Sequence, residues 1–88
     1  MQEMRYFFYL ARCSDGSLYA GTTANLRECE RRHNEGRGGR DTRTRLPVRI
    51  VYSEVCDSMR DARKREVEVK SWPKEDRETL GRQPPISP

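Results

Sequence analysis

A complete β-hairpin signal lies near the start of the chain, in Leu10-Ala11-Arg12-Cys13-Ser14-Asp15-Gly16-Ser17-Leu18-Tyr19-Ala20-Gly21-Thr22-Thr23. Its first half belongs to an aromatic-rich run over residues 6–13, which predicts a largely buried strand. Asp15-Gly16 is typical of a two-residue hairpin turn, and residues 17–21 then form the returning strand. We therefore expect two antiparallel strands joined by a tight turn.

A helix, a loop and a third strand are predicted after the hairpin. Asn25 suits the N-cap of a helix that begins at residue 26 and stops at Gly36. Residues 36–46 contain no apolar run and predict a basic loop. Residues 47–53 are predicted as the third strand, and Pro47 suits its first position because proline cannot donate to the strand ladder.

Two more helices are predicted in the remainder of the chain. Asp57 or Ser58 suits the N-cap of a long helix, and Pro73 fits the first turn of a shorter helix over residues 74–80. The 3–4 spacing gives the long helix one face made of Met59, Ala62, Glu66 and Val69. Glu66 therefore interrupts a face that is otherwise apolar.

The order strand, strand, helix, strand, helix, helix predicts an α+β domain with a small antiparallel sheet and helices packed around it. The domain is expected to span residues 1–80. Residues 81–88 contain three prolines and are expected to form a disordered tail.

Composition excludes several classes of protein. The 88 residues suffice for one domain with a thin core, since 33% of them are hydrophobic and 36% are charged. No apolar run approaches the ~20 residues of a membrane helix. The N-terminus also lacks the apolar stretch and cleavage site of a signal peptide. A soluble, cytoplasmic protein with no membrane contact is expected.

The cysteines predict neither a disulfide nor a structural zinc site. Cys13, Cys29 and Cys56 are odd in number, widely spaced and form no CxxC pair. Cys29 and His33 lie four residues apart on one predicted helix face, but two ligands are too few for a zinc site.

The net charge of +4 is concentrated in one stretch of the chain. Residues 27–49 hold four acidic residues and eight basic ones, all of them arginine: Arg27, Arg31, Arg32, Arg37, Arg40, Arg43, Arg45 and Arg49. Arginine suits bidentate contact with phosphate, and clustered positive charge is typical of nucleic-acid binding. The predicted nucleic-acid contacts are Arg37, Arg40, Arg43 and Arg45. The alternative is a solvated basic loop that has no partner.

Four side chains are candidates for chemistry. Tyr9 and Tyr19 lie on neighbouring strands and can face one another, while His33 and Glu66 lie on the inner faces of the first two helices. An inward carboxylate is costly without a partner, so Glu66 indicates an arginine, a metal or a functional pocket. Two phenols, an imidazole, a carboxylate and arginines can cleave a phosphodiester with the help of a divalent metal.

Each candidate also has a purely structural interpretation. The tyrosines can be strand aromatics, His33 can bond a loop carbonyl, and Glu66 can pair with Arg12 or Arg63. Residue types and spacing alone leave these alternatives open.

The same residues belong to an ordered series of motifs that resembles a known family. The series comprises the hairpin segment from Leu10 to Thr23, His33-Asn34-Glu35-Gly36-Arg37-Gly38, the strand from Pro47-Val48 to Tyr52-Ser53-Glu54, and Arg65-Glu66 to Lys70-Ser71-Trp72. From about Phe7 to Leu80 the chain is similar to the small stand-alone GIY-YIG proteins. Tyr19-Ala20-Gly21 is a weak signal alone, whereas the whole series in this order is specific.

The resemblance implies a fold and an activity. The GIY-YIG fold is a three-stranded antiparallel sheet flanked by helices, and members include homing endonucleases, restriction enzymes and nucleases of DNA repair. The implied reaction is cleavage of DNA, or of RNA, with Mg²⁺ or Mn²⁺. Tyr9 would be the general base, Tyr19 would position the water, Glu66 would bind the metal, and His33 would lie near the scissile phosphate.

One position departs from the family pattern. Nuclease members carry an arginine ten residues after the second-motif tyrosine, where this chain has Cys29. A thiol cannot neutralise phosphate charge, and loss of such a contact costs roughly 10²–10³ in rate. Arg32, one helical turn on, is the candidate replacement. Two functions therefore remain open, a metal-dependent nuclease and a non-catalytic nucleic-acid-binding module. A third, less favoured interpretation is an accessory domain that recruits a protein partner.

Overall fold

The central strand of the protein is β1 (Tyr6–Arg12), in a computed structural model that describes residues 5–82. It pairs antiparallel with β2 (Leu18–Thr23) on one side and with β3 (Arg49–Cys56) on the other. The predicted hairpin is confirmed, with Tyr9 opposite Gly21 and Ala11 opposite Tyr19. The predicted two-residue turn is wrong, because the backbone N–H of Cys13 donates to the carbonyl of Ser17 and three residues, ending in Gly16 with a φ of 88°, lie between them. Strand β2 lies at one edge of the sheet, so its side away from β1 pairs with no strand of the described residues.

Four helices complete the described chain, namely α1 (Leu26–Asn34), α2 (Arg40–Arg43), α3 (Met59–Lys70) and α4 (Lys74–Gly81). The predicted N-caps hold, because the side chains of Asn25 and Ser58 accept hydrogen bonds from the backbone at the start of α1 and α3. The α+β architecture and the element order are confirmed. The predicted basic loop contains the additional four-residue helix α2.

Some predicted boundaries are wrong. Strand β3 begins at Arg49 and continues to Cys56, because pairing with β1 extends past residue 53. Gly81, predicted to begin the tail, is the buried last residue of α4. The rest of the predicted tail, residues 83–88, lies outside the described residues.

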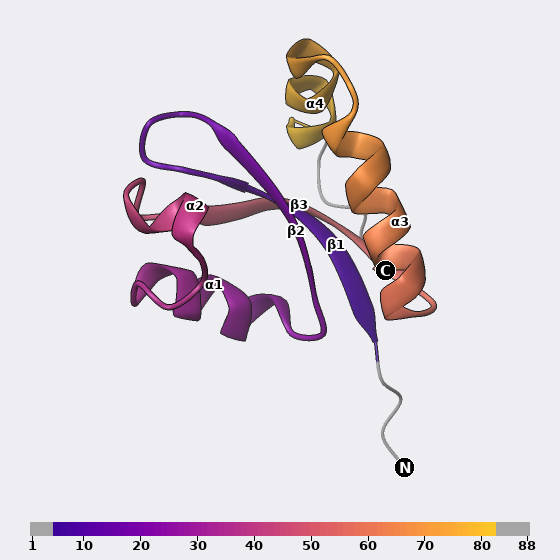
Figure 1. The fold of residues 1–88 in the computed structure, drawn as a ribbon, viewed down its shortest axis with the longest axis horizontal. Helices are drawn as coiled ribbons and strands as arrows, with labels where there is room; N and C mark the ends of the chain where they lie inside the picture. The colour runs from indigo at the N-terminus through magenta and orange to yellow at the C-terminus, as the bar shows by residue number, and fades with distance from the viewer. Residues whose placement is uncertain (1–4, 83–88) are drawn as a thin grey trace.

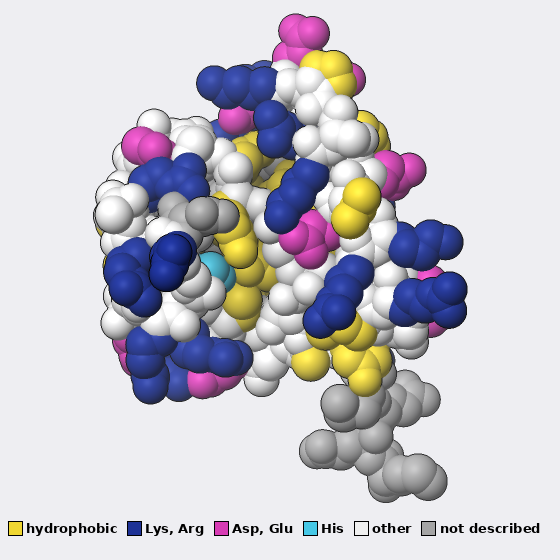
Figure 2. Space-filling model, viewed as in Figure 1, with side chains coloured by type: hydrophobic (Ala, Val, Ile, Leu, Met, Phe, Trp, Pro, Cys, Tyr) yellow, Lys and Arg dark blue, Asp and Glu magenta, His cyan; other side chains and the backbone are white. Residues whose placement is uncertain are grey.

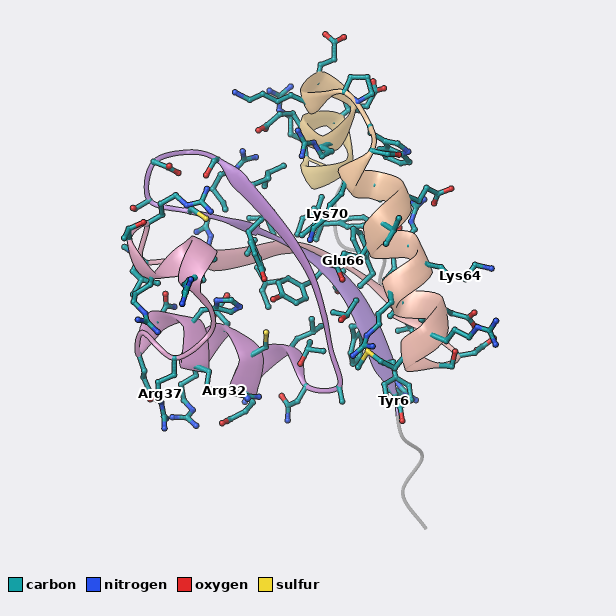
Figure 3. The ribbon with its side chains drawn as sticks, in the orientation of Figure 1. Tyr6, Arg32, Arg37, Lys64, Glu66 and Lys70 are labelled. Carbon is teal, nitrogen blue, oxygen red and sulfur yellow. The ribbon has the colours of Figure 1, made fainter. Side chains whose placement is uncertain are left out.

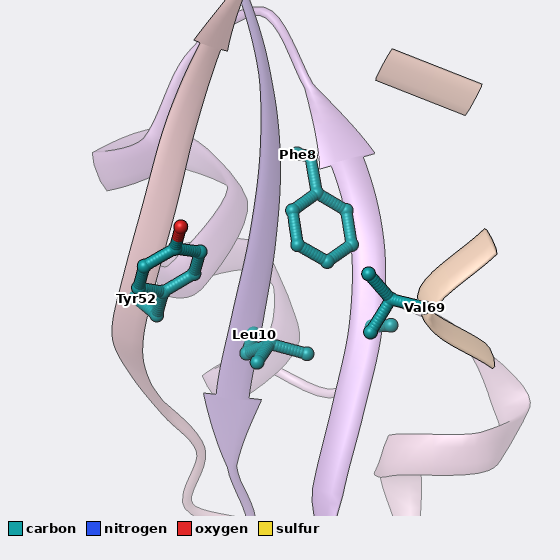
Figure 4. Packing of buried hydrophobic residues seen from close by; sticks show 5 residues of the cluster. Phe8, Leu10, Tyr52 and Val69 are labelled. Carbon is teal, nitrogen blue, oxygen red and sulfur yellow. The ribbon is translucent and has the colours of Figure 1, made fainter. Parts of the chain in front are cut away.

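The hydrophobic core has two halves, one on each face of β1. Successive strand residues point to opposite faces. Phe8 and Leu10 therefore face α3 and pack with Val69 and Tyr52, while Tyr9 and Ala11 face α1. Figure 4 shows the first of these groups around the sheet. Figure 1 shows the result, with α1 and α2 on one face of the sheet and α3 and α4 on the other.

Arginine side chains fix the C-terminal helices to the sheet. Nη1 of Arg12 in β1 donates to both carboxylate oxygens of Glu78 in α4, at 2.8 and 2.9 Å. The Arg65 guanidinium lies over the rings of Phe8 and Trp72, and Trp72 packs on the core beside Leu80. Trp72, at the junction of α3 and α4, therefore packs against the core.

Candidate active site

A polar cavity of about 390 Å³ lies beside edge strand β2, where residues from both layers of helices meet. Its lining comes from β1 and β2 (Tyr9, Tyr19, Gly21, Thr22, Thr23), from α1 and the loop after it (Cys29, Arg32, His33, Arg37, Gly38), and from α3 (Arg63, Glu66). In Figure 2 the histidine lies in a hollow with a hydrophobic floor and Lys and Arg side chains on both sides. The cavity therefore contains every predicted catalytic residue.

Tyr9 is at the centre of the site and is only 2% exposed. Its hydroxyl lies 3.1 Å from Nε2 of His33 and accepts a hydrogen bond from the Cys29 thiol at 3.2 Å. The ring of Tyr19 packs against the rings of Tyr9 and His33. Its centroid lies 6.4 Å from that of Tyr9 and 5.4 Å from that of His33. The two tyrosines do face one another, as the sequence predicts.

Two glycines make this packing possible. Gly21 lies opposite Tyr9 in the hairpin, and a Cβ at Gly21 would lie 2.6 Å from the Tyr9 hydroxyl. A Cβ at Gly38 would lie 2.2 Å from Nδ1 of His33. The glycine of the Tyr19-Ala20-Gly21 motif is therefore needed to leave room for the Tyr9 ring.

Hydroxyl groups lie against both ring nitrogens of His33. The hydroxyl of Thr42, in α2, lies 2.7 Å from Nδ1 of His33 and 3.5 Å from the carbonyl oxygen of Gly39. In the tautomer that is protonated at Nδ1, the Thr42 oxygen accepts that proton and Nε2 is unprotonated. Nε2 of His33 can therefore accept the proton of the Tyr9 hydroxyl. The alternative bond from His33 to a loop carbonyl is wrong, since hydroxyls occupy both ring nitrogens.

The ionisation of these groups follows from burial. Burial raises the pKa of Tyr9 above its usual range, and the Cys29 hydrogen bond adds to the effect. Burial, with a smaller contribution from Arg32, lowers the pKa of His33 below 6.5. At neutral pH the site thus holds a neutral phenol beside a neutral imidazole. Tyr9 can act as a base only if its own proton moves to His33.

Glu66 points from α3 toward the sheet (Figure 3) and is half-buried. Its Oε2 pairs with Nζ of Lys70 at 2.7 Å. The predicted partners Arg12 and Arg63 are therefore wrong, because Lys70 lies one turn further along the same helix and Arg12 is occupied by Glu78.

The cavity suits a divalent metal that takes few protein ligands. Within residues 5–82 no three His, Cys, Asp or Glu side chains come together as a metal-binding group. Mg²⁺ commonly takes one or two carboxylates and completes its shell with water and substrate phosphate. Glu66 is the one carboxylate among the described residues that line the cavity, and it fits that pattern.

The predicted arginines have three different locations. Arg32 and Arg37 line the cavity, and Arg37 also pairs with Glu35. Arg45 donates to the hydroxyl of Ser17 at 2.8 Å, which ties the loop after α2 to the hairpin turn. The remaining two, Arg40 and Arg43 in α2, are exposed and do not line the cavity.

Thr42, Gly38 and Arg63 are among the residues of the site that were not predicted as members. Arg63 lies one turn before Glu66, so 3–4 spacing could have identified it. Nothing in the local sequence indicates Thr42, because its contact with His33 depends on how α2 folds back onto α1.

Comparison with known proteins agrees with this geometry. The model of the GIY-YIG catalytic domain matches residues 5–79. The chain therefore belongs to the GIY-YIG family, which is a nuclease family.

Relatives of similar size have been described from bacilli and staphylococci. A UPF0213 protein of Bacillus pumilus is 40% identical over 72 residues, which is 82% of this chain and 74% of that protein. A UPF0213 protein of Staphylococcus aureus is 40% identical over 67 residues, or 76% and 82% of the two chains. The solution NMR structure of a UPF0213 protein from Bacillus halodurans has a TM-score of 0.56 and 34% identity. The matched region covers 88% of this chain and 82% of the Bacillus halodurans protein.

None of the helices described between residues 5 and 82 is long and apolar enough to span a membrane.

Proposed function

We propose that this protein is a metal-dependent nuclease that hydrolyses phosphodiester bonds of DNA, or of RNA, in the cavity beside β2. The observation that carries the proposal is the meeting of Tyr9, Tyr19, His33 and Glu66 in one cavity. These residues come from four different elements, so a purely structural role for each of them separately does not account for their convergence.

The chain supplies a path for the proton of the attacking water. Tyr9 accepts that proton while its own proton moves 3.1 Å to Nε2 of His33. The oxygen of the water attacks phosphorus, and the bond from phosphorus to the leaving oxygen breaks. The bonding electron pair stays on the leaving oxygen, which takes a proton from solvent. His33 holds the transferred proton as an imidazolium, which the Thr42 hydroxyl stabilises through Nδ1. Tyr19 orients the water from the open side of the site.

The developing charge on the phosphate requires cations. Glu66 would hold a Mg²⁺ or Mn²⁺ ion, which when bound polarises the phosphate as a Lewis acid. Arg32, Arg37 and Arg63 line the same cavity. We assign to Arg32 the role that an arginine at position 29 has in other family nucleases, since it lies one helical turn from Cys29.

The alternative function is binding without cleavage, and Cys29 supports it. The thiol bonds the Tyr9 hydroxyl at a position where nuclease members present a guanidinium. A thiol adds no positive charge to the cavity, so a substrate could bind there without stabilisation of the transition state.

The test of the nuclease is cleavage of single-stranded, double-stranded and branched DNA, and of RNA, with Mg²⁺ or Mn²⁺. Glu66→Gln keeps the shape of the side chain and removes its charge, so it should abolish cleavage and preserve binding. Asp61→Asn, at an exposed carboxylate of the same helix, is the matched control and should cleave as the wild type does. Cleavage that survives Glu66→Gln would overturn the proposal.

The same panel separates the two functions. A wild type that binds without cleaving, together with a Cys29→Arg variant that cleaves, would establish the binding module. If Arg32 is the replacement, Arg32→Ala should lower kcat by roughly 10² or more. Exposed Arg27→Ala on the same helix should leave kcat unchanged.

A further inference from the structure

A second cavity adjoins the candidate active site. It has a volume of about 340 Å³ and is lined by Leu10, Leu18, Tyr19, Ala20, Arg45, Lys70 and Arg77. Tyr19 lines both cavities, and Lys70 pairs with Glu66 of the first one. The two cavities therefore lie on either side of Tyr19 and of the Glu66–Lys70 pair. Figure 3 shows Lys70 one turn beyond Glu66 on the sheet-facing side of α3.

The second cavity is strongly cationic. Its three charged side chains are all basic, and they come from the loop after α2, from the end of α3 and from α4. No carboxylate is among the described residues that line it. The strand residues contribute an apolar floor. The apolar floor of the second cavity can therefore contact a sugar or a base. The basic side chains around this floor can contact a phosphate.

The surrounding structure holds these cations in place. Arg45 is bonded to Ser17, and the backbone carbonyl of Arg45 accepts from Ser14 at 2.9 Å. Helix α4 is fixed to β1 by the ion pair of Arg12 with Glu78, the residue next to Arg77. The Arg77 guanidinium itself forms no ion pair or hydrogen bond with the described residues. A preorganised cation without a carboxylate partner is well placed to bind an external anion.

We propose that this second cavity is a subsite for a neighbouring phosphodiester of the same nucleic-acid strand whose scissile phosphate lies in the first cavity. Arg77 and Lys70 are the new contacts, and Arg45 completes the subsite. The identity of the ligand as a nucleic-acid strand rests on the proposed function. The two cavities then define the path of the strand across Tyr19, with one phosphate on each side of that ring.

The test is a binding titration of fluorescent oligonucleotides without divalent metal, so that no turnover occurs. A single strand, its duplex and the matching RNA are titrated from low to high salt. The slope of log K against log salt is negative. Neutralising a residue that contacts a phosphate makes this slope shallower by about 1. Arg77→Gln and Lys70→Gln should each weaken binding and make the slope shallower by about that amount on at least one of these ligands.

Arg82→Gln is the matched control, because Arg82 caps the same helix, carries the same charge and does not line the subsite. It should bind as the wild type does. Equal losses from Arg77→Gln and Arg82→Gln would show a diffuse effect of charge and overturn the subsite. An unchanged slope in Arg77→Gln would overturn it as well. Thermal unfolding of each variant verifies that the fold is retained.

The experiments test the proposed subsite and the proposed nuclease activity independently. A protein that binds through Arg77 but never cleaves with metal disproves the reaction and retains the subsite. A protein that cleaves, with Arg77→Gln binding unchanged, disproves the subsite alone. Absence of all nucleic-acid binding at low salt overturns both.

Discussion

The Tyr9 hydroxyl, enclosed by His33 and Cys29, shows how much of this site depends on single atoms. Gly21 provides the space for the Tyr9 ring, and Gly38 provides the space for His33. Overpacking of a filled site typically costs about 1–3 kcal/mol. Both glycines therefore have a steric role, because a side chain at either position would overlap with Tyr9 or His33.

Titration of His33 should control stability in a narrow pH range. It is the only histidine, and burial lowers its pKa in the folded protein below 6.5. Below pH 6.5 the unfolded chain therefore binds more protons than the folded one, so the free energy of unfolding falls as the pH decreases from 6.5 through the folded pKa. At pH values well above 6.5 both states are neutral at this group and its contribution is constant.

Urea denaturation between pH 7.5 and 5.5 checks this expectation. His33→Gln retains a hydrogen-bonding side chain without the titration, so its stability should depend less on pH within that range. Identical pH dependence in both proteins, or an NMR titration of His33 with a midpoint above 6.5, would contradict it.

Helix α3 contributes to the site on one face and to the fold on another. Glu66 reaches the cavity, while Arg65 binds Glu54 of β3 through two bonds of 3.0 Å and Glu68 at 2.5 Å. The Arg65 guanidinium also lies 5.1 Å from the centroid of the Trp72 ring. Arg65 therefore fixes α3 to β3 and positions Glu66 indirectly.

Replacement of Arg65 by lysine should not be conservative. An ammonium cannot make two parallel bonds to Glu54 and stack on Trp72 at the same time. Arg65→Lys should lower the free energy of unfolding by about 1–2 kcal/mol, measured by urea denaturation. Arg60→Lys, exposed on the same helix, is the control and should stay within about 0.5 kcal/mol of the wild type. Equal stability of Arg65→Lys and wild type would show that the contacts of the guanidinium contribute little.

At the scale of the whole molecule, positive charge surrounds the hollow of the site. Arg32, Arg37 and Arg63 line the first cavity, and Lys70 and Arg77 line the second. The basic stretch over residues 27–49 supplies one wall, and the cations of α3 and α4 supply the other. Figure 2 shows Lys and Arg side chains on both sides of the hollow.

Removal of charge outside the cavities should affect affinity and leave the chemistry unchanged. Arg40 and Arg43 are exposed in α2. The double substitution Arg40→Ala with Arg43→Ala should therefore make the slope of log K against log salt for nucleic-acid binding shallower by up to about 2. Its kcat should equal that of the wild type, since neither side chain lines the first cavity. An unchanged slope would mean that α2 is a solvated basic segment without a partner.

The sequence by itself determined the order of the elements, the helix caps and the family, because turns, caps and periodicity are local properties of the chain. The Asp15-Gly16 turn and the caps Asn25 and Ser58 are examples. It also predicted that Tyr9, Tyr19, His33 and Glu66 belong together, although that came from the order of the motifs and not from any one of them.

Only the tertiary structure decided the partners of these residues. The contacts of His33 with Thr42, of Glu66 with Lys70 and of Arg12 with Glu78 depend on how helices dock on the two faces of β1. Three-dimensional packing also brought Arg77 beside Tyr19, although the two are far apart in the chain. The physical reason is that hydrogen bonds and ion pairs require specific distances between atoms, and in this protein those distances are set by the packing of side chains from several elements.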